Sequence, residues 1–422
     1  MSRHADQQNE AHPSTNATVA MLAALMGLNS FAIDAMIPAL PQIGHDLGVV
    51  AQNDRQLVVI AYMLGFGSTQ LIWGPLADRF GRKPILAAGI ILYSGFALLC
   101  ALAGSFPMLI AARACQGASA AVTRVLIVAV IRDLFEAEEM ARVMSLTFMV
   151  FMVMPVIAPS IGQLILFAAP WRAIFFALAA YGLVMLVWSS LKLPETLHPE
   201  YKRSLHWRDI LRASWATIEE PQSRGYTIAL TLVFGCLTAY IASIQQIVAE
   251  AFDAPGAIGI VFALVAAPMA LASWANSRIV HRFGLRRVGH SGAAGFAAVT
   301  LVHALVGTAG GESLALFVGF QGLAMVGFAF CSANLSTLAM EHMGSIAGTA
   351  SSVQGVVGTI GGALIGFAIG RAFDGTVHPF LWGFAIAAIA AFASVMLTEP
   401  KRLFERASGR PLAGPPEPPP EL

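Results

Sequence analysis

Asp34 is the one acidic side chain that lies well inside an apolar run of the sequence, whereas the other acidic residues fall in loops, tails or the ends of such runs. A charged group in membrane hydrocarbon costs about 2.5–3.5 kcal/mol on insertion scales, so it normally faces a cavity or a partner. A carboxylate that moves between apolar surroundings and a nearby cation can take up and release a proton. Asp34 is therefore a candidate proton carrier. The alternative is a fixed structural carboxylate that is bonded to neighbouring hydroxyl and backbone groups.

Two arginines in one later apolar run could act with this carboxylate. Arg113 lies about six residues into its run and Asp34 about four from the end of its own, which places both roughly 6–9 Å below the same surface. We expect Arg113 to sense or share the charge of Asp34, although a structural arginine bonded to backbone carbonyls is a competing interpretation. Arg124 follows eleven residues later, close to three helical turns, and so shares the face of Arg113. Gln116 lies beside them, and both Gln116 and Arg124 are candidate cavity residues.

Further candidates for substrate contacts have apolar or neutral polar side chains. Met36 follows Asp34 closely, and a thioether adapts to ligands of varied shape. Tyr240, Gln245 and Gln246 lie in the last part of the seventh apolar run. For each of them, ordinary helix packing is the competing interpretation.

Catalytic and metal-binding patterns are not found in the sequence. The four cysteines fall in apolar runs without Cys-x-x-Cys or Cys/His spacing, so a metal site or a disulfide framework is not expected. The histidines show no nucleophile or ligand spacing, and no Walker-type phosphate loop is present. We therefore expect neither an enzyme nor a cofactor.

The composition indicates that most of the chain lies in a lipid membrane. Of 422 residues, 57% are hydrophobic and 12% are charged, whereas soluble domains have about 45–50% apolar and 25% charged residues. A helix of about 20 apolar residues crosses a bilayer. Such stretches predict an all-α membrane protein with twelve transmembrane helices. They lie at about 18–38, 56–77, 84–104, 107–131, 143–167, 172–192, 225–248, 257–277, 288–309, 313–340, 346–370 and 379–398.

The positions of the basic residues predict the orientation. With the N-terminus inside, twenty of the 25 Lys and Arg residues fall on the cytoplasmic side, and only Arg55, Arg172 and Arg371 fall outside. Both termini are thus expected in the cytoplasm. The net charge of +1 gives no reason to expect nucleic acid as a partner.

One long connection divides the spans into two groups of six. The predicted organisation is a polar tail at 1–17, a six-helix bundle at 18–192, a cytoplasmic linker loop at 193–224, a second bundle at 225–398 and a disordered tail at 399–422. Short echoes at offsets of 203, 205 and 204 residues relate the two bundles: DRFGR to HRFGL, Gln116-Gly117 to Gln321-Gly322, and Ile161-Gly162 to Ile365-Gly366. The halves therefore look like duplicated, pseudo-symmetric units with a binding site at their interface.

The loop after the second span carries the segment GPLADRFGRKP at residues 74–84. We expect Gly74 to allow close helix approach, Gly81 to form a tight turn, and Asp78 to pair with a cation or a helix N-terminus as a gating latch. Arg79, Arg82 and Lys83 would hold this loop at the inner surface. The segment resembles the loop signature of the major facilitator superfamily.

A subfamily resemblance is carried by several shorter runs. These are IDAMIPALP (33–41), RACQG (113–117), APSIG (158–162), NSR (276–278) and AGTASS (347–352). Together they resemble the Bcr/CflA drug-resistance transporters over residues 20–400. Pro159 and Gly162 fall where that group has its antiporter signature, although this chain has Ala158-Pro159 and Gly162-Gln163 in place of Gly-Pro and Gly-Gly.

The resemblance implies a monomeric transporter in a bacterial inner membrane, surrounded by membrane lipids. It would export a small amphipathic organic substrate in exchange for protons, by alternating access. The best alternative is a proton-linked importer of a nutrient or metabolite. A non-transporting membrane receptor or scaffold is a third hypothesis, and it predicts that the reconstituted chain moves nothing.

Overall fold

The computed structural model describes residues 15–135, 137–197 and 207–405, and within these ranges every regular element is a helix. Twelve helices are long: α1 (Thr15–Asp34), α3 (Leu57–Phe80), α4 (Arg82–Ala101), α5 (Phe106–Leu134), α6 (Ala137–Ala168), α7 (Arg172–Lys192), α9 (Pro221–Gln246), α10 (Ile258–Phe283), α11 (Leu285–Gly310), α12 (Leu314–Ala339), α13 (Ala347–Arg371) and α14 (His378–Thr398). Among the described residues, eleven apolar helical segments are long enough to cross a membrane, and α6, with 32 residues, is the twelfth long helix. The predicted all-α membrane fold is confirmed.

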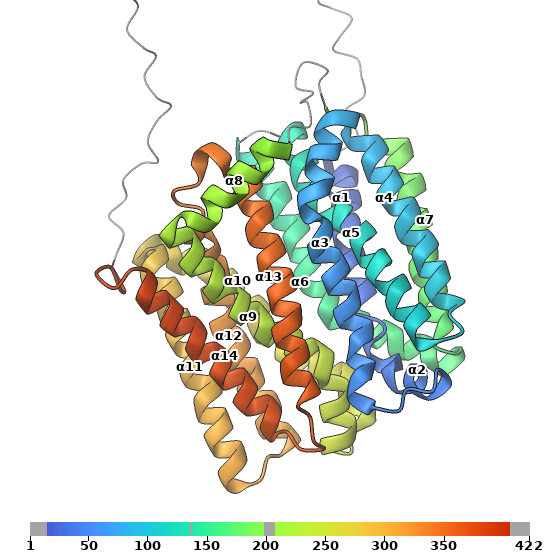
Figure 1. Cartoon of the computed structure of the whole chain (residues 1–422), viewed down its shortest axis with the longest axis vertical. Coiled ribbons are helices and arrows are strands. Elements are labelled where there is room, and N and C mark those ends of the chain that lie inside the picture. The colour runs from blue at the N-terminus through green and yellow to red at the C-terminus, as the bar shows by residue number, and fades with distance from the viewer. Residues whose placement is uncertain (1–14, 136, 198–206, 406–422) are drawn as a thin grey trace, which may run out of the picture.

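The long helices form two groups that lie side by side (Figure 1). We call α1 to α7 the N-half and α9 to α14 the C-half. In the N-half, α3 packs on α5, α4 on α5 and α7, and α1 on α6. In the C-half, α9 packs on α13 and α14, α11 on α12 and α14, and α10 on α12. The halves meet where α3 contacts α13 and where α6 contacts α10.

Two short helices distinguish the two ends of the molecule. The helix α8 (Trp207–Glu219) lies at one end and α2 (Leu40–Asp46) at the other (Figure 1). We call these the α8 end and the α2 end. Each half has its own buried apolar core.

The first helix stops earlier than the sequence predicts. It ends at Asp34 and is followed by two turn residues, a single 3-10 turn at Ile37–Ala39, and α2. Pro38 and Pro41 fall in this stretch, and proline has no backbone N–H to continue an α-helical ladder. The break places Asp34 at a helix end within the membrane-spanning bundle.

The linker contains a helix rather than only a loop, which corrects the prediction for this segment. Helix α8 packs against α9 and α13. It exposes Leu211, Trp215 and Ile218, which are spaced along one face. Such an apolar stripe is typical of a helix that lies in a membrane interface. Residues 198–206 of the predicted linker lie outside the described residues.

The segment after α14 is ordered further than predicted. Between residues 399 and 405 the chain folds back on the C-half, where the backbone N–H of Phe404 donates to His290 Nδ1 at 3.3 Å. Residues 399–405 are therefore ordered, unlike the prediction for them, and residues 406–422 lie outside the described residues, as do residues 1–14.

Candidate functional site

The carboxyl group of Asp34 is enclosed at the end of α1. The residue is 2% exposed, and its Oδ1 has no hydrogen-bond partner among the described residues. Helix α6 approaches the following turn so closely that a Cβ on Gly162 would lie 1.8 Å from the carbonyl oxygen of Ala35. Gly162 is thus required here because no side chain fits, and Pro159 is buried in the same helix. The antiporter-signature helix therefore packs directly against the Asp34 turn.

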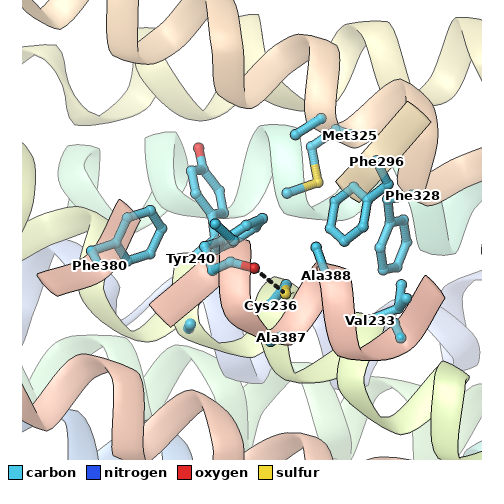
Figure 2. Close-up of a cluster of buried hydrophobic side chains, with 14 of the residues drawn as sticks. Val233, Cys236, Tyr240, Phe296, Met325, Phe328, Phe380, Ala387 and Ala388 are labelled. Carbon is cyan, nitrogen blue, oxygen red and sulfur yellow. Dashed lines mark hydrogen bonds between the residues drawn. The ribbon is translucent and has the colours of Figure 1, made fainter. Parts of the chain in front are cut away.

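The turn after Asp34 lies against both halves of the molecule. Its 3-10 turn at Ile37–Ala39 contacts α6 and α9, and Ile37 belongs to the same buried cluster as Tyr240 of α9. Tyr240 is 4% exposed and its hydroxyl has no partner among the described residues. Figure 2 shows its ring within the apolar core of the C-half, where it packs on Phe262 at 5.5 Å between centroids. Among the described residues, a carboxylate oxygen of one half and a hydroxyl of the other are thus both buried without a hydrogen-bond partner.

Arg113 is fully buried and makes three hydrogen bonds. Its Nε donates to Val58 O at 3.1 Å, its Nη1 to Gln116 Oε1 at 2.8 Å, and its Nη2 to Ala32 O at 3.2 Å. The guanidinium also lies 4.4 Å from the ring centroid of Tyr62. The ion pairs found among the described residues do not include Arg113 with Asp34. These contacts match the structural interpretation, and the coupling of Arg113 to Asp34 stays a prediction.

A polar network beside Asp34 was not predicted from the sequence. Tyr62 donates to Asn29 Oδ1 at 3.0 Å, and Asn29 Nδ2 donates to Thr123 Oγ1 at 2.7 Å. All three side chains are buried and join α3, α1 and α5. An amide in the middle of the first apolar run was the available signal, since such a group needs a partner in lipid.

The other predicted cavity residues occupy different positions. Met36 is fully buried in the N-half core, and Gln116 is bonded to Arg113 with its Nε2 unpartnered among the described residues. Gln245 is 4% exposed and Arg124 is partly exposed on α5. Met36 thus packs as core, whereas the ligand role of the other residues stays a prediction.

Gln246 joins the two halves at the α2 end. Its Nε2 donates to Asn53 Oδ1 at 2.7 Å, and its Oε1 accepts from Gln56 Nε2 at 3.2 Å. Asn53 also donates to the carbonyls of Arg371 at 2.9 Å and Phe373 at 2.8 Å. We call Asn53, Gln56 and Gln246 the amide seam. It closes the boundary between the halves.

Further contacts between the halves lie in the same region. Arg55 pairs with Glu250 at 3.6 Å at the α2 end, and midway along the helices Gln70 Nε2 donates to Thr359 Oγ1 at 3.2 Å. The hydrogen bonds and ion pairs found between the halves, within the described ranges, thus lie between the α2 end and the middle. The structure is a state closed at the α2 end.

The gating loop is bound within its own half. Arg82 pairs with Asp78 at 2.5 Å and with Asp133 at 3.3 Å. The carboxylate of Glu195 accepts from the backbone N–H groups of Arg82 at 2.8 Å and Lys83 at 3.2 Å, and so caps the N-terminus of α4. In this state Asp78 binds a cation, one of its two predicted partners.

The two glycines of the gating loop differ in their roles. Gly81 has φ +107° and its added Cβ would lie 2.5 Å from Glu195 Oε2, so both backbone and space demand glycine. Gly74 has only Val125 at 3.7 Å, which is ordinary contact. The expectation of a close helix approach at Gly74 is therefore wrong. Arg79 lies over the ring of its neighbour Phe80 at 5.2 Å.

The C-half repeats this arrangement with different bonds. Gly284 has φ +85°, and Arg286, 204 residues after Arg82, pairs with Glu341 at 2.5 Å and Glu399 at 2.8 Å. Tyr226 donates to Glu399 at 2.6 Å. Partial burial opposes ionisation of Glu399, but the bonds from Arg286 and Tyr226 hold the pKa of this carboxyl below its usual value.

A cavity of about 390 Å³ lies elsewhere, between α10, α11 and α12 of the C-half. It is lined mainly by apolar residues and glycines, with Arg287 among them. None of the predicted site residues lines it. The candidate site is therefore the Asp34 region rather than this cavity.

Comparison with known proteins decides the family. The family described as Major Facilitator Superfamily matches residues 22–366. The chain belongs to the major facilitator superfamily. It is therefore a multi-pass membrane protein of a transporter family rather than an enzyme family.

Relatives within the superfamily confirm the Bcr/CflA resemblance. A bicyclomycin resistance protein homolog of Haemophilus influenzae is 31% identical over 395 residues, which cover 91% of this chain and 97% of that protein. Multidrug resistance protein MdtL of Shewanella sp. is 28% identical, with 87% and 92% of the two chains covered.

Solved structures of the superfamily share the fold. A D-xylose–proton symporter matches with a TM-score of 0.72 and 14% identity, covering 90% of this chain and 96% of that one. The human organic anion transporter MFSD10 (TETRAN) matches with a TM-score of 0.66 and 17% identity, covering 91% and 100%. At these identities the likeness concerns the fold alone.

Proposed function

We propose that this chain exports small amphipathic organic compounds, drugs among them, in exchange for protons across a bacterial inner membrane. The observation that carries the proposal is Asp34, a buried carboxylate at the boundary between the halves with one oxygen left unpartnered. The names of the two relatives support efflux of drugs as the activity. The protein acts as a monomer surrounded by membrane lipids.

The contacts between the halves suggest how transport proceeds. If the α8 end, which carries Arg82 and Arg286, faces the cytoplasm, the amide seam closes the outer side in this state. Substrate then enters from the cytoplasm. Protonation of Asp34 removes a buried charge beside the turn that contacts α9 of the other half, and so biases which end is closed.

The proton gradient supplies sufficient energy for this work. One proton contributes about 2.3 kcal/mol per 100 mV and about 1.4 kcal/mol per pH unit. Each 1.4 kcal/mol supports about a tenfold concentration gradient. A single carboxylate that is loaded on one side and unloaded on the other therefore suffices.

The test is transport in proteoliposomes with an imposed pH gradient, with bicyclomycin and a panel of amphipathic drugs as probes. We expect the parent protein to accumulate drug against its gradient and Asp34→Asn to lose this accumulation. Asp374→Asn is the matched control, because Asp374 lies in an exposed loop and bonds only within that loop among the described residues. Proton-driven accumulation by Asp34→Asn at every pH contradicts the proposal, and solute moving with the proton indicates the importer instead.

A further inference from the structure

His303 and Glu312 form a buried pair in the C-half, away from Asp34. His303 lies in α11, and Glu312 lies in the connection to α12 at the α2 end. His303 Nε2 is 2.9 Å from Glu312 Oε1, and each side chain is 3% exposed. The carboxyl group is folded back so far into the bundle that a Cβ on Gly307 would lie 2.4 Å from Glu312 Oε2.

The side chains around the pair do not compensate its charge. Gln321 Nε2 lies 3.5 Å from His303 Nδ1, and the ring of Phe320 stacks on the imidazole at 4.7 Å. Phe317 of α12 packs on the imidazole, and Leu381 of α14 adjoins Gly307. Within the described part of the chain, Glu312 is the ionisable group that acts on His303. An ionised Glu312 beside a neutral His303 therefore leaves an uncompensated buried charge.

Two buried oxygen atoms at the pair have no hydrogen-bond donor among the described residues. These atoms are Glu312 Oε2 and Gln321 Oε1. A buried charge without compensation is strongly unfavourable, whereas a carboxylate paired with an imidazolium is neutral overall. One bound proton converts the first arrangement into the second.

The N-half has no imidazole at the position that corresponds to His303. His303 follows Cys100 by 203 residues, and Gln321 follows Gln116 by 205. In the N-half, Cys100 Sγ lies 3.8 Å from Gln116 Oε1. A thiol and an amide thus occupy the positions at which the C-half has an imidazole and an amide. The imidazole, unlike the thiol, changes charge near neutral pH in its ordinary state.

We propose that the His303–Glu312 pair is a second proton-binding site, which takes up one proton from the α2 side independently of Asp34. The turn at Gly311, with φ +80°, lies next to Glu312, and Gly310 and Gly311 are exposed. Glu312 is therefore the residue next to the exposed surface of the α2 end, although its side chain is buried. That the α2 side is the outer side rests on the proposed function, but the binding of the proton does not.

The test counts protons on the purified protein without substrate. Proton uptake is measured from about pH 8 to about pH 5, a range in which ordinary carboxylates stay largely ionised. We expect Glu312→Gln to bind one proton fewer than the parent protein, because a buried imidazolium would then have no counter-charge. The double variant that adds His303→Gln should also bind one proton fewer, because the two groups share a single proton. Equal uptake by the parent and the folded variants overturns the proposal and makes the pair a structural contact.

A second measurement avoids dependence on the folding of these variants. Histidine nitrogen NMR of the unmutated protein should show one imidazole that is shielded from solvent and nevertheless gains a proton over this pH range. If every imidazole that gains a proton is solvent-accessible, the proposal fails.

Asp34→Asn separates this inference from the proposed function. That variant should keep the proton uptake that Glu312→Gln loses. If Asp34→Asn still accumulates drug, the proposed function fails while the second site stands. If Asp34→Asn itself abolishes the uptake assigned to Glu312, the two sites are not independent and the inference fails.

Discussion

In the N-half, Asp34 keeps a carboxylate oxygen without a partner at the boundary between the halves, whereas in the C-half Glu399 is bonded to both Arg286 and Tyr226. The two carboxylates thus occupy opposite situations in a repeated fold. A group with a vacant bonding position can change partners as the halves move. A group whose partners lie within its own half instead holds that half rigid. The comparison teaches that repeated bundles can place their carboxylates in different bonding environments.

The two halves also differ in how closely helices pack at the repeat-related glycines Gly117 and Gly322. A Cβ on Gly117 in the N-half would lie 2.0 Å from the backbone oxygen of Tyr62. A Cβ on Gly322 in the C-half would lie no closer than 3.4 Å to Pro268. At these positions the N-half therefore packs α3 and α5 more closely than the C-half packs α10 and α12.

The sharpest comparison of the halves is between Arg286→Gln and Arg82→Gln. We expect Arg286→Gln to cost about 2–3 kcal/mol of stability, because it leaves the partly buried Glu399 and Glu341 without the cation that they share. Arg82→Gln should cost about 1–2 kcal/mol, because Asp78 is partly exposed and Asp133 keeps a hydrogen bond from Thr196. Unfolding of the purified variants in detergent measures both. If Arg82→Gln lost more stability than Arg286→Gln, the N-half rather than the C-half would be the more rigidly bonded half.

Alanine at the two repeat-related glycines tests the packing difference. Gly117→Ala should destabilise the protein by about 1–3 kcal/mol, because the methyl group meets fixed backbone. Gly322→Ala should be neutral or stabilising, since alanine gains about 0.8–1.0 kcal/mol over glycine in a helix. Thermal midpoints in one detergent compare the two. Equal effects would show that the backbones relax alike in both halves.

The pH dependence of the Glu399 contribution follows from its lowered pKa. A folded-state pKa below the unfolded value gives stability that is fully present above the unfolded pKa and is lost as the pH falls through the folded pKa. Because Glu399 is partly exposed, we expect only on the order of 1 kcal/mol at neutral pH. The difference in unfolding midpoint between the parent protein and Glu399→Gln should shrink between about pH 5 and about pH 3. A difference that is constant over this range would indicate that the bonds to Glu399 do not depend on its charge.

The smallest expected effects distinguish the two tyrosines near Asp34. Tyr62→Phe removes a hydroxyl that donates to Asn29 and should cost about 1 kcal/mol. Tyr240→Phe removes a hydroxyl without a partner and should leave stability unchanged, while it alters the pH dependence of transport. Unfolding and proteoliposome assays on the same preparations test both. An unaltered pH profile for Tyr240→Phe would remove Tyr240 from the coupling step.

The sequence predicts the helices well because membrane burial imposes a simple rule of length and hydropathy. The predicted span at 172–192 has the same bounds as α7. The first span was misjudged at its end, because Ile37 and Ala39 are as apolar as the helix before them and only the prolines interrupt the ladder. The helix in the linker was missed because amphipathic α8 has too few apolar residues to span a membrane.

The candidate site was predictable only in part. Asp34 was found because a charge within an apolar run is conspicuous without any knowledge of tertiary structure. Glu312 was missed because it lies in a connection by position and becomes buried only when the chain turns back at Gly311. Likewise, no spacing rule could show that Arg113 bonds to the carbonyls of Val58 and Ala32, which belong to other helices.

The amide seam is bonded chiefly by neutral groups, namely Asn53, Gln56, Gln246 and backbone carbonyls. Gln246 Nε2 also donates to Glu250 Oε2 at 3.4 Å. Amides neither gain nor lose protons in the physiological range, so acid cannot break the bonds between these amides by titrating them. The mutual bonds of the seam are thus indifferent to protons.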